Sequence, residues 1–103
     1  MENLEAVETI LRDIQTKIWE YRFKKDNIRI EDIRVYPEYV KDSNVSYIAA
    51  EFIYPESDRQ VTMTIFIFHN QGTYEMSGYN TRYCNSLMEN IKEYLSLLGY
   101  ERA

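Results

Sequence analysis

The chain has 103 residues, with 12 basic and 17 acidic side chains, one histidine and one cysteine. This length predicts one domain over residues 1–103, and 45% apolar and 15% aromatic residues argue against disorder. The net charge of −5 disfavours a broad phosphate-binding surface. With no leader-like N-terminus, no long apolar run and no possible internal disulfide, we expect a cytoplasmic protein that binds no membrane.

The first predicted element is a helix from Asn3 to Lys25. Its apolar residues recur at spacings of three and four and form one face, namely Leu4, Val7, Ile10, Leu11, Ile14, Ile18 and Tyr21. Trp19 and Phe23 lie off this face, one helical turn apart. Two outcomes are open for this pair: either the following chain at Ile28 and Ile30 covers it, or it forms an aromatic anchor for a partner.

Four strands are predicted next, because the apolar period changes to two. They cover residues 33–39, Val45–Tyr54, Val61–His69 and Thr73–Gly78, with turns at 41–44 and 69–72 and a loop between the middle strands. Pro37 lacks an N–H group, which places the first strand at an edge of the sheet. We therefore expect an antiparallel meander.

Symmetric closure of the loops predicts the register. The predicted partners of the first two strands are Ile33 with Phe52, Val35 with Ala50 and Pro37 with Ile48. The predicted partners of the second and third strands are Phe52 with Met63, Ala50 with Ile65 and Ile48 with Ile67. Both sets gather apolar side chains on one face, here named the inner face.

The opposite, outer face then has its own predicted contacts. Arg34 lies across from Glu51 as a structural ion pair, and Tyr47 lies across from Phe68. The fourth strand is left open between two arrangements. A loop of two or four residues turns Tyr74 and Met76 inward, whereas a three-residue loop with a bulge turns them outward.

The last predicted element is a helix from Thr81 to Leu98 that ends at Gly99. Its apolar face includes Cys84, which we expect to be buried and unreactive. The predicted fold class is α+β with two layers. A four-stranded antiparallel meander sheet carries the N-terminal and C-terminal helices on one face, in the order α-β-β-β-β-α.

No catalytic, cofactor or metal site is predicted, and we expect a protein that is not an enzyme. His69 and Cys84 would need a third, orienting group to act as base and nucleophile. A metal would need three or four converging ligands, and no glycine-rich loop is present to hold a phosphate.

The outer face is the candidate binding site, with Tyr36, Tyr47, Phe66 and Phe68 on it and Trp19 and Phe23 as the second anchor. The sequence favours a small, tyrosine-rich binding or regulatory protein. Its partner is either a second copy in a homodimer or another protein, such as a basic nucleic-acid enzyme. Abundant Ile and Tyr residues hint at an origin in a bacterium, a phage or a mobile element, where an inhibitor of the anti-CRISPR kind is one version. The alternative is a module that stacks single-stranded nucleic acid on the aromatic face, against which the negative charge argues.

Overall fold

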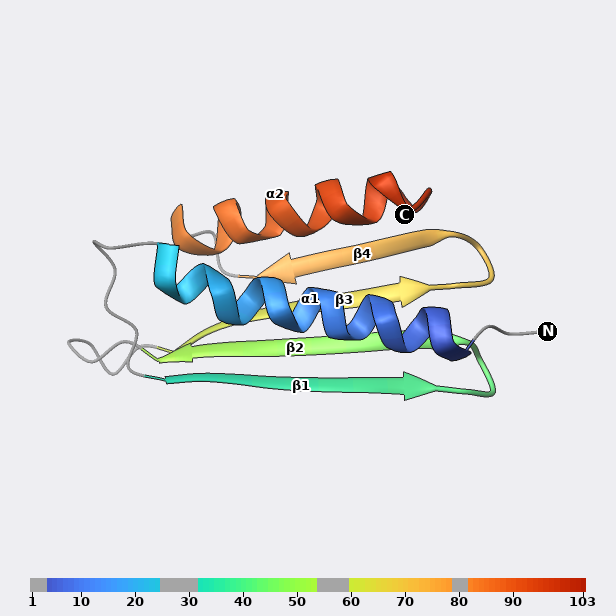
Figure 1. Cartoon of the computed structure of the whole chain (residues 1–103), viewed down its shortest axis with the longest axis horizontal. Helices are drawn as coiled ribbons and strands as arrows, with labels where there is room; N and C mark the ends of the chain where they lie inside the picture. Colours follow the sequence, from blue (N-terminus) through green and yellow to red (C-terminus); the bar gives the residue numbers. More distant parts are fainter. Residues whose placement is uncertain (1–3, 25–31, 54–59, 79–81) are drawn as a thin grey trace.

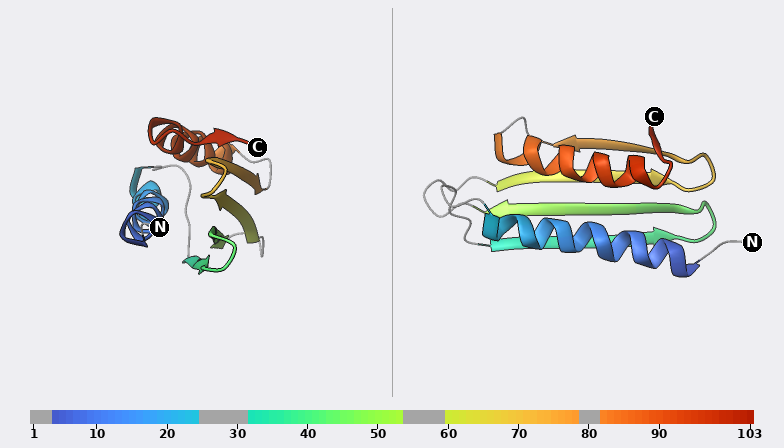
Figure 2. Two further views of the ribbon diagram at one scale, coloured as in Figure 1. Left: turned by 90° about the vertical axis from the view of Figure 1, so that its right-hand side faces the viewer. Right: turned by 45° about the horizontal axis from the view of Figure 1, so that its top comes forward.

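The computed structural model describes residues 4–24, 32–53, 60–78 and 82–103, without the side chains of 21–24, 32, 53, 60–61 and 82–85. Its elements in chain order are α1 (Leu4–Lys24), β1 (Asp32–Val40), β2 (Val45–Ile53), β3 (Gln60–Phe68), β4 (Thr73–Gly78), α2 (Arg82–Leu97) and β5 (Glu101–Arg102). Both helices cover the same face of one sheet, so the protein is α+β with two layers (Figures 1 and 2).

The core lies between the helices and the inner face of the sheet. The helices bury residues three or four positions apart, as expected for one apolar stripe on each, namely Val7, Ile10, Ile14, Ile18, Leu87, Ile91 and Leu95. The sheet contributes alternate residues, among them Ile48, Phe52, Met63, Ile65 and Ile67, which are all fully buried. Neither helix, over its described residues, is long and apolar enough to cross a lipid bilayer.

The first pair of strands has the predicted register, with Ile33 opposite Phe52 and Arg34 opposite Glu51. The second pair is shifted by two residues from the prediction, so that Phe52 lies opposite Val61 and Tyr47 lies opposite Phe66 rather than Phe68. A shift of two leaves every side chain on its predicted face. The hydrophobic pattern therefore does not distinguish the two registers.

The β3–β4 connection settles the facing of the fourth strand. Phe68 lies opposite Thr73, so residues 69–72 form a four-residue loop between the two strands. This is the first of the two predicted arrangements. The amide of Gly72, whose φ is 66°, donates to the carbonyl oxygen of Phe68 at 2.9 Å. As a result, Tyr74 and Met76 point inward and are only 5% and 8% exposed.

The prediction of a four-stranded, fully antiparallel sheet is wrong at the edge next to β4. Gly99 ends α2 with a φ of 95°, and the Tyr100 amide donates to the carbonyl oxygen of Leu95 at 3.0 Å. This turn lays β5 parallel to β4, giving a five-stranded mixed sheet in the order β1-β2-β3-β4-β5. A strand of two residues has no period that the sequence could reveal.

Candidate functional site: the outer face of the sheet

The outer face is the surface of the sheet that neither helix covers (Figure 2). Strand β3 shows the contrast between the two faces most directly. Ile65 and Ile67 are fully buried on the inner face, whereas Phe66 between them is 39% exposed. Because successive side chains of a strand point to opposite faces, Phe66 cannot join the core without changing the register of the whole strand.

Three aromatic rings meet on this face. The ring centroids of Tyr47 and Phe66 are 4.8 Å apart with an interplanar angle of 48°, and those of Phe66 and Phe68 are 6.4 Å apart at 14°. Both distances are typical of favourable aromatic pairs. Tyr47, Phe66 and Phe68 are named the aromatic cluster below.

Tyr36 shares the face with this cluster but lies on the edge strand β1. Its side chain is 48% exposed, and its hydroxyl donates to a carboxylate oxygen of Glu51 at 3.3 Å. Glu51 also lies opposite Arg34 in the register, as predicted. The carboxylate of Glu51 is therefore part of a polar group at one end of the outer face, beside the aromatic cluster rather than within it.

One row of cross-strand partners passes through the middle of the cluster. It runs across four strands as Glu38, Tyr47, Phe66 and Glu75. Glu38 and Glu75 are both exposed. The aromatic pair at the centre of the face is therefore bordered on both sides by a carboxylate, an arrangement called the central row below.

A shallow depression lies beside the central row. It has a volume of about 320 Å³ and is lined by Thr62, Thr64, Ser77 and Gly78. The hydroxyl oxygens of Thr64 and Ser77 are 2.7 Å apart and hydrogen-bonded. The outer face thus offers aromatic, acidic and hydroxyl groups to whatever contacts it.

The predicted second anchor is not part of this face. Trp19 is 40% exposed, and it belongs to α1, in the layer on the other side of the sheet. The side chain of Phe23 lies outside the described residues, as do Ile28 and Ile30. Trp19 thus cannot contact the same flat surface of a partner as Phe66.

His69 takes part in a hydrogen-bonded chain that sequence reasoning missed. Its Nε2 lies 2.6 Å from the hydroxyl oxygen of Ser46, and its Nδ1 lies 2.8 Å from that of Tyr100. Ser46 is fully buried, and burial lowers the pKa of the His69 imidazole. A hydroxyl group that is fully buried is not accessible to a substrate. The hydrogen bonds from His69 instead connect β2 to the segment after α2.

His69 and Cys84, which the sequence offered as a base and a nucleophile but which were not predicted to act together, lie on segments far apart in the fold. Cys84 belongs to the first turn of α2, which begins at the opposite end of the sheet from the β3–β4 turn that holds His69 (Figure 1). The side chain of Cys84 itself is outside the described part of the chain, so its burial stays a prediction. Within that described part, no three His, Cys, Asp or Glu side chains gather as metal ligands would.

No protein-family model matches the chain, and no curated protein or solved structure is significantly similar to it.

Proposed function

We propose that this protein binds a basic surface of another protein through the outer face of its sheet, and that it acts by occupying that surface. The central row is the observation that carries the proposal. A pair of aromatic rings offers apolar area to a partner, and the exposed carboxylates of Glu38 and Glu75 on either side select for positive charge.

The same row argues against a homodimer formed face to face. In a dimer whose twofold axis passes through the Tyr47–Phe66 pair, an axis along the row would stack Glu38 on Glu38 of the second copy, and an axis perpendicular to the row would stack Glu38 on Glu75. Like charges brought together across an interface cost several kcal/mol. A partner with arginine or lysine around an apolar centre avoids this repulsion.

Charge also argues against the stacking of single-stranded nucleic acid. Such modules combine exposed rings with a positively charged groove that follows the phosphates. Here the described charged residues of the outer face are Arg34 against Glu38, Glu51, Glu75 and Glu101, which sum to −3. A nucleic-acid enzyme, in contrast, has a basic surface for its own substrate, and a protein on that surface would inhibit it.

Site-specific photocrosslinking tests the proposal. A photoreactive phenylalanine analogue at Phe66 is compared with the same analogue at Leu97, which is 83% exposed on α2 in the other layer. We expect crosslinks from position 66 to a basic protein and few from position 97. The partner identified in this way is then titrated against the Phe66→Ser and Leu97→Ser variants, and only the first should bind more weakly.

Other results would contradict the proposal. Crosslinks from position 66 only to a second copy, with a dimer in sedimentation velocity, would identify a homodimer. Binding of a labelled single-stranded oligonucleotide at low salt, lost in Phe66→Ser, would identify a stacking module. Equal crosslinking from positions 66 and 97 would show that the outer face has no special role.

A further inference from the structure

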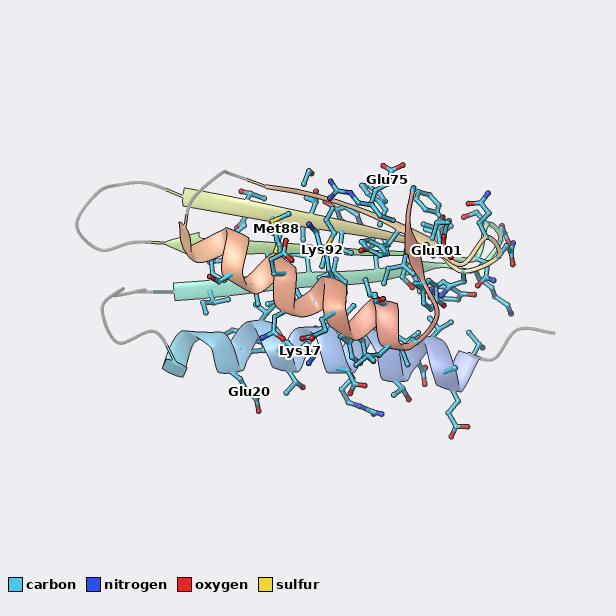
Figure 3. The ribbon with its side chains drawn as sticks, turned by 90° about the horizontal axis from the view of Figure 1, so that it is seen from above. Lys17, Glu20, Glu75, Met88, Lys92 and Glu101 are labelled. Atoms are coloured by element: carbon cyan, nitrogen blue, oxygen red, sulfur yellow. The ribbon has the colours of Figure 1, made fainter. Side chains whose placement is uncertain are left out.

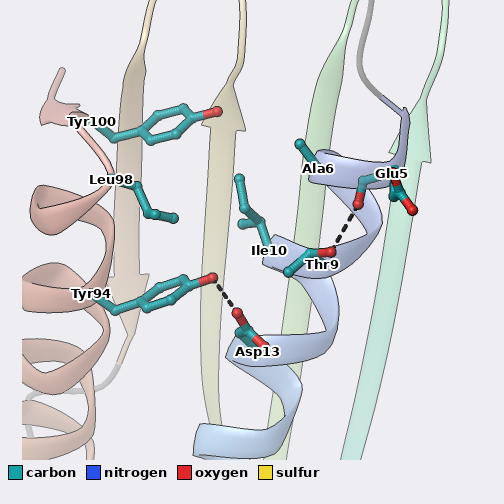
Figure 4. Close-up of a pocket in the computed structure, with 8 residues that line it drawn as sticks. All are labelled: Glu5, Ala6, Thr9, Ile10, Asp13, Tyr94, Leu98 and Tyr100. Atoms are coloured by element: carbon teal, nitrogen blue, oxygen red, sulfur yellow. Dashed lines mark hydrogen bonds between the residues drawn. The ribbon is translucent and has the colours of Figure 1, made fainter.

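A pocket of about 580 Å³ opens between α1 and α2, in the layer away from the outer face. Five of its residues come from α1, among them Glu5, Ile10 and Asp13, and three come from the end of α2 and the segment after it, namely Tyr94, Leu98 and Tyr100. Figure 4 shows Tyr94, Leu98 and Tyr100 opposite Ile10 and Asp13, with the Glu5 side chain at the rim, on the side of α1 away from α2. The volume lies in the range of pockets that hold small molecules.

The position of the Asp13 carboxylate is fixed by the opposite wall. The hydroxyl of Tyr94 donates to Oδ2 of Asp13 at 2.7 Å (Figure 4). Burial, and then this hydrogen bond, raise the pKa of Tyr94, so the phenol keeps its proton and remains the donor. A carboxylate has about four acceptor positions, so Asp13 retains capacity for a ligand donor.

The lining has the chemistry of a site for an organic cation. Ile10 forms an apolar part of the wall and is 8% exposed, and the rings of Tyr94 and Tyr100 stand opposite it (Figure 4). The lining residues include the carboxylates of Glu5 and Asp13 and no cationic side chain. Carboxylates and aromatic rings both attract ammonium groups, and methylene groups prefer an apolar wall.

An ammonium group of the protein itself already uses one of these rings. The Nζ atom of Lys17 lies 5.0 Å from the centroid of the Tyr94 ring. Lys17 is one helical turn beyond Asp13 and does not line the pocket. The ring therefore attracts a cation in its own protein, while the space bordered by Glu5, Asp13 and Tyr100 stays open.

We propose that this pocket binds a linear aliphatic polyamine, with one ammonium group at Asp13, the methylene chain along Ile10 and Leu98, and a second ammonium group at the rim, where the exposed Glu5 side chain turns to meet it. Glu5 and Asp13 are eight residues apart on α1, which corresponds to about 12 Å along the helix axis. An extended triamine such as spermidine spans that separation, and ethylenediamine does not. The site is independent of the partner surface proposed above.

Calorimetric titration with spermidine tests this site in the full-length protein. We expect binding with a dissociation constant of about 0.1–1 mM at low salt, and at least about fivefold weaker binding of ethylenediamine. Glu5→Gln and Asp13→Asn should each weaken spermidine binding by about threefold to fivefold, the effect of one partly exposed ion pair. Asparagine still accepts the Tyr94 hydrogen bond, so thermal melting should show both variants folded.

Glu20→Gln is the matched control, because it removes one exposed carboxylate from the same helix outside the pocket. The control should bind spermidine like the original protein, and so should Phe66→Ser. Equal weakening in Glu20→Gln would show diffuse attraction of a polycation to an acidic protein and would overturn the proposal. No heat of binding at about 5 mM spermidine would overturn it as well.

Discussion

The two faces of the sheet are built from the same strands and nevertheless differ in burial. On the inner face, Phe52 is fully buried between the strands and the helices. On the outer face, Phe66 keeps 39% of its surface exposed beside Tyr47. The comparison teaches that residue type does not distinguish a core phenylalanine from a contact phenylalanine. The two phenylalanines differ because alternate residues of a strand point to opposite faces and because both helices cover only one of these faces (Figure 3).

The largest expected difference between the faces is in stability. Phe52→Ala should lower the free energy of unfolding by about 3–5 kcal/mol, because it removes a buried ring and leaves a cavity. Phe66→Ala should lower it by less than about 1.5 kcal/mol, because part of that ring is already in water. Urea unfolding of both variants measures the two effects. Similar losses would mean that something covers the outer face in the free protein.

The second test moves from stability to binding. Replacing Phe66 and Phe68 with serine should leave the protein folded and weaken binding of the partner at least about tenfold, since burying one phenylalanine on association contributes about 1.5–3 kcal/mol. Thermal melting and a binding titration are done on the same sample. Unfolding of this double variant at ordinary temperature would place the two rings in the core and contradict the two-face description.

Charge reversal on the central row separates the two kinds of protein partner. Glu38→Lys should weaken binding to a basic partner by about fivefold, and added salt should reduce this difference, because exposed charges are screened. In a face-to-face homodimer that stacks Glu38 on Glu75 of the second copy, the same substitution would place lysine against glutamate and strengthen association. Sedimentation velocity and a partner titration at two salt concentrations give opposite answers for the two cases.

A smaller effect is expected from the hydrogen-bonded chain at the end of the inner face. Burial lowers the pKa of His69 below its ordinary value of 6.5, so the unfolded chain takes up a proton at a higher pH than the folded one. Stability from this group is therefore complete above about pH 6.5 and is lost as the pH falls below it. Tyr100→Phe should cost about 1 kcal/mol at neutral pH by removing one hydrogen bond.

Urea unfolding at pH 7.5 and 5.5 measures this dependence. His69 is the one histidine of the chain, so His69→Gln removes the titrating group while keeping a side chain that forms hydrogen bonds. We expect a smaller loss of stability between the two pH values in this variant. An equal loss would show that carboxylates, not His69, produce the pH dependence.

Short-range patterns predicted much of the fold. Alternation placed Tyr36, Tyr47, Phe66 and Phe68 on the outer face, and the turn at 41–44, where Asn44 has a φ of 55°, gave the register of β1 and β2. The register of β2 and β3 was predicted wrongly because a shift of two residues leaves every side chain on the same face of the sheet. Local patterns decide parity, whereas only the three-dimensional packing decides which strand positions meet.

Contacts between distant residues could not be predicted in this way. Asp13 and Tyr94 are 81 residues apart, and nothing near either residue shows that the two helices bring them together. The same holds for the chain from Ser46 through His69 to Tyr100, which depends on the turn after α2. Single polar residues beside an apolar stripe have many possible partners, so the pocket and the histidine chain required the structure.

The smallest expected effect concerns two oppositely charged cross-strand partners at the edge of the outer face. Arg34 and Glu51 are cross-strand partners, and Glu51 also accepts a hydrogen bond from Tyr36. A double-mutant cycle with Arg34→Ala and Glu51→Ala should give a coupling of about 0.2–1 kcal/mol in the free protein, because water screens exposed charges. Repeating the cycle with the partner bound should raise the coupling, since a covered ion pair loses that screening. A coupling above about 2 kcal/mol in the free protein would mean that the outer face is already buried, most simply by a second copy. That result would contradict the proposal of a basic protein partner and favour a homodimer.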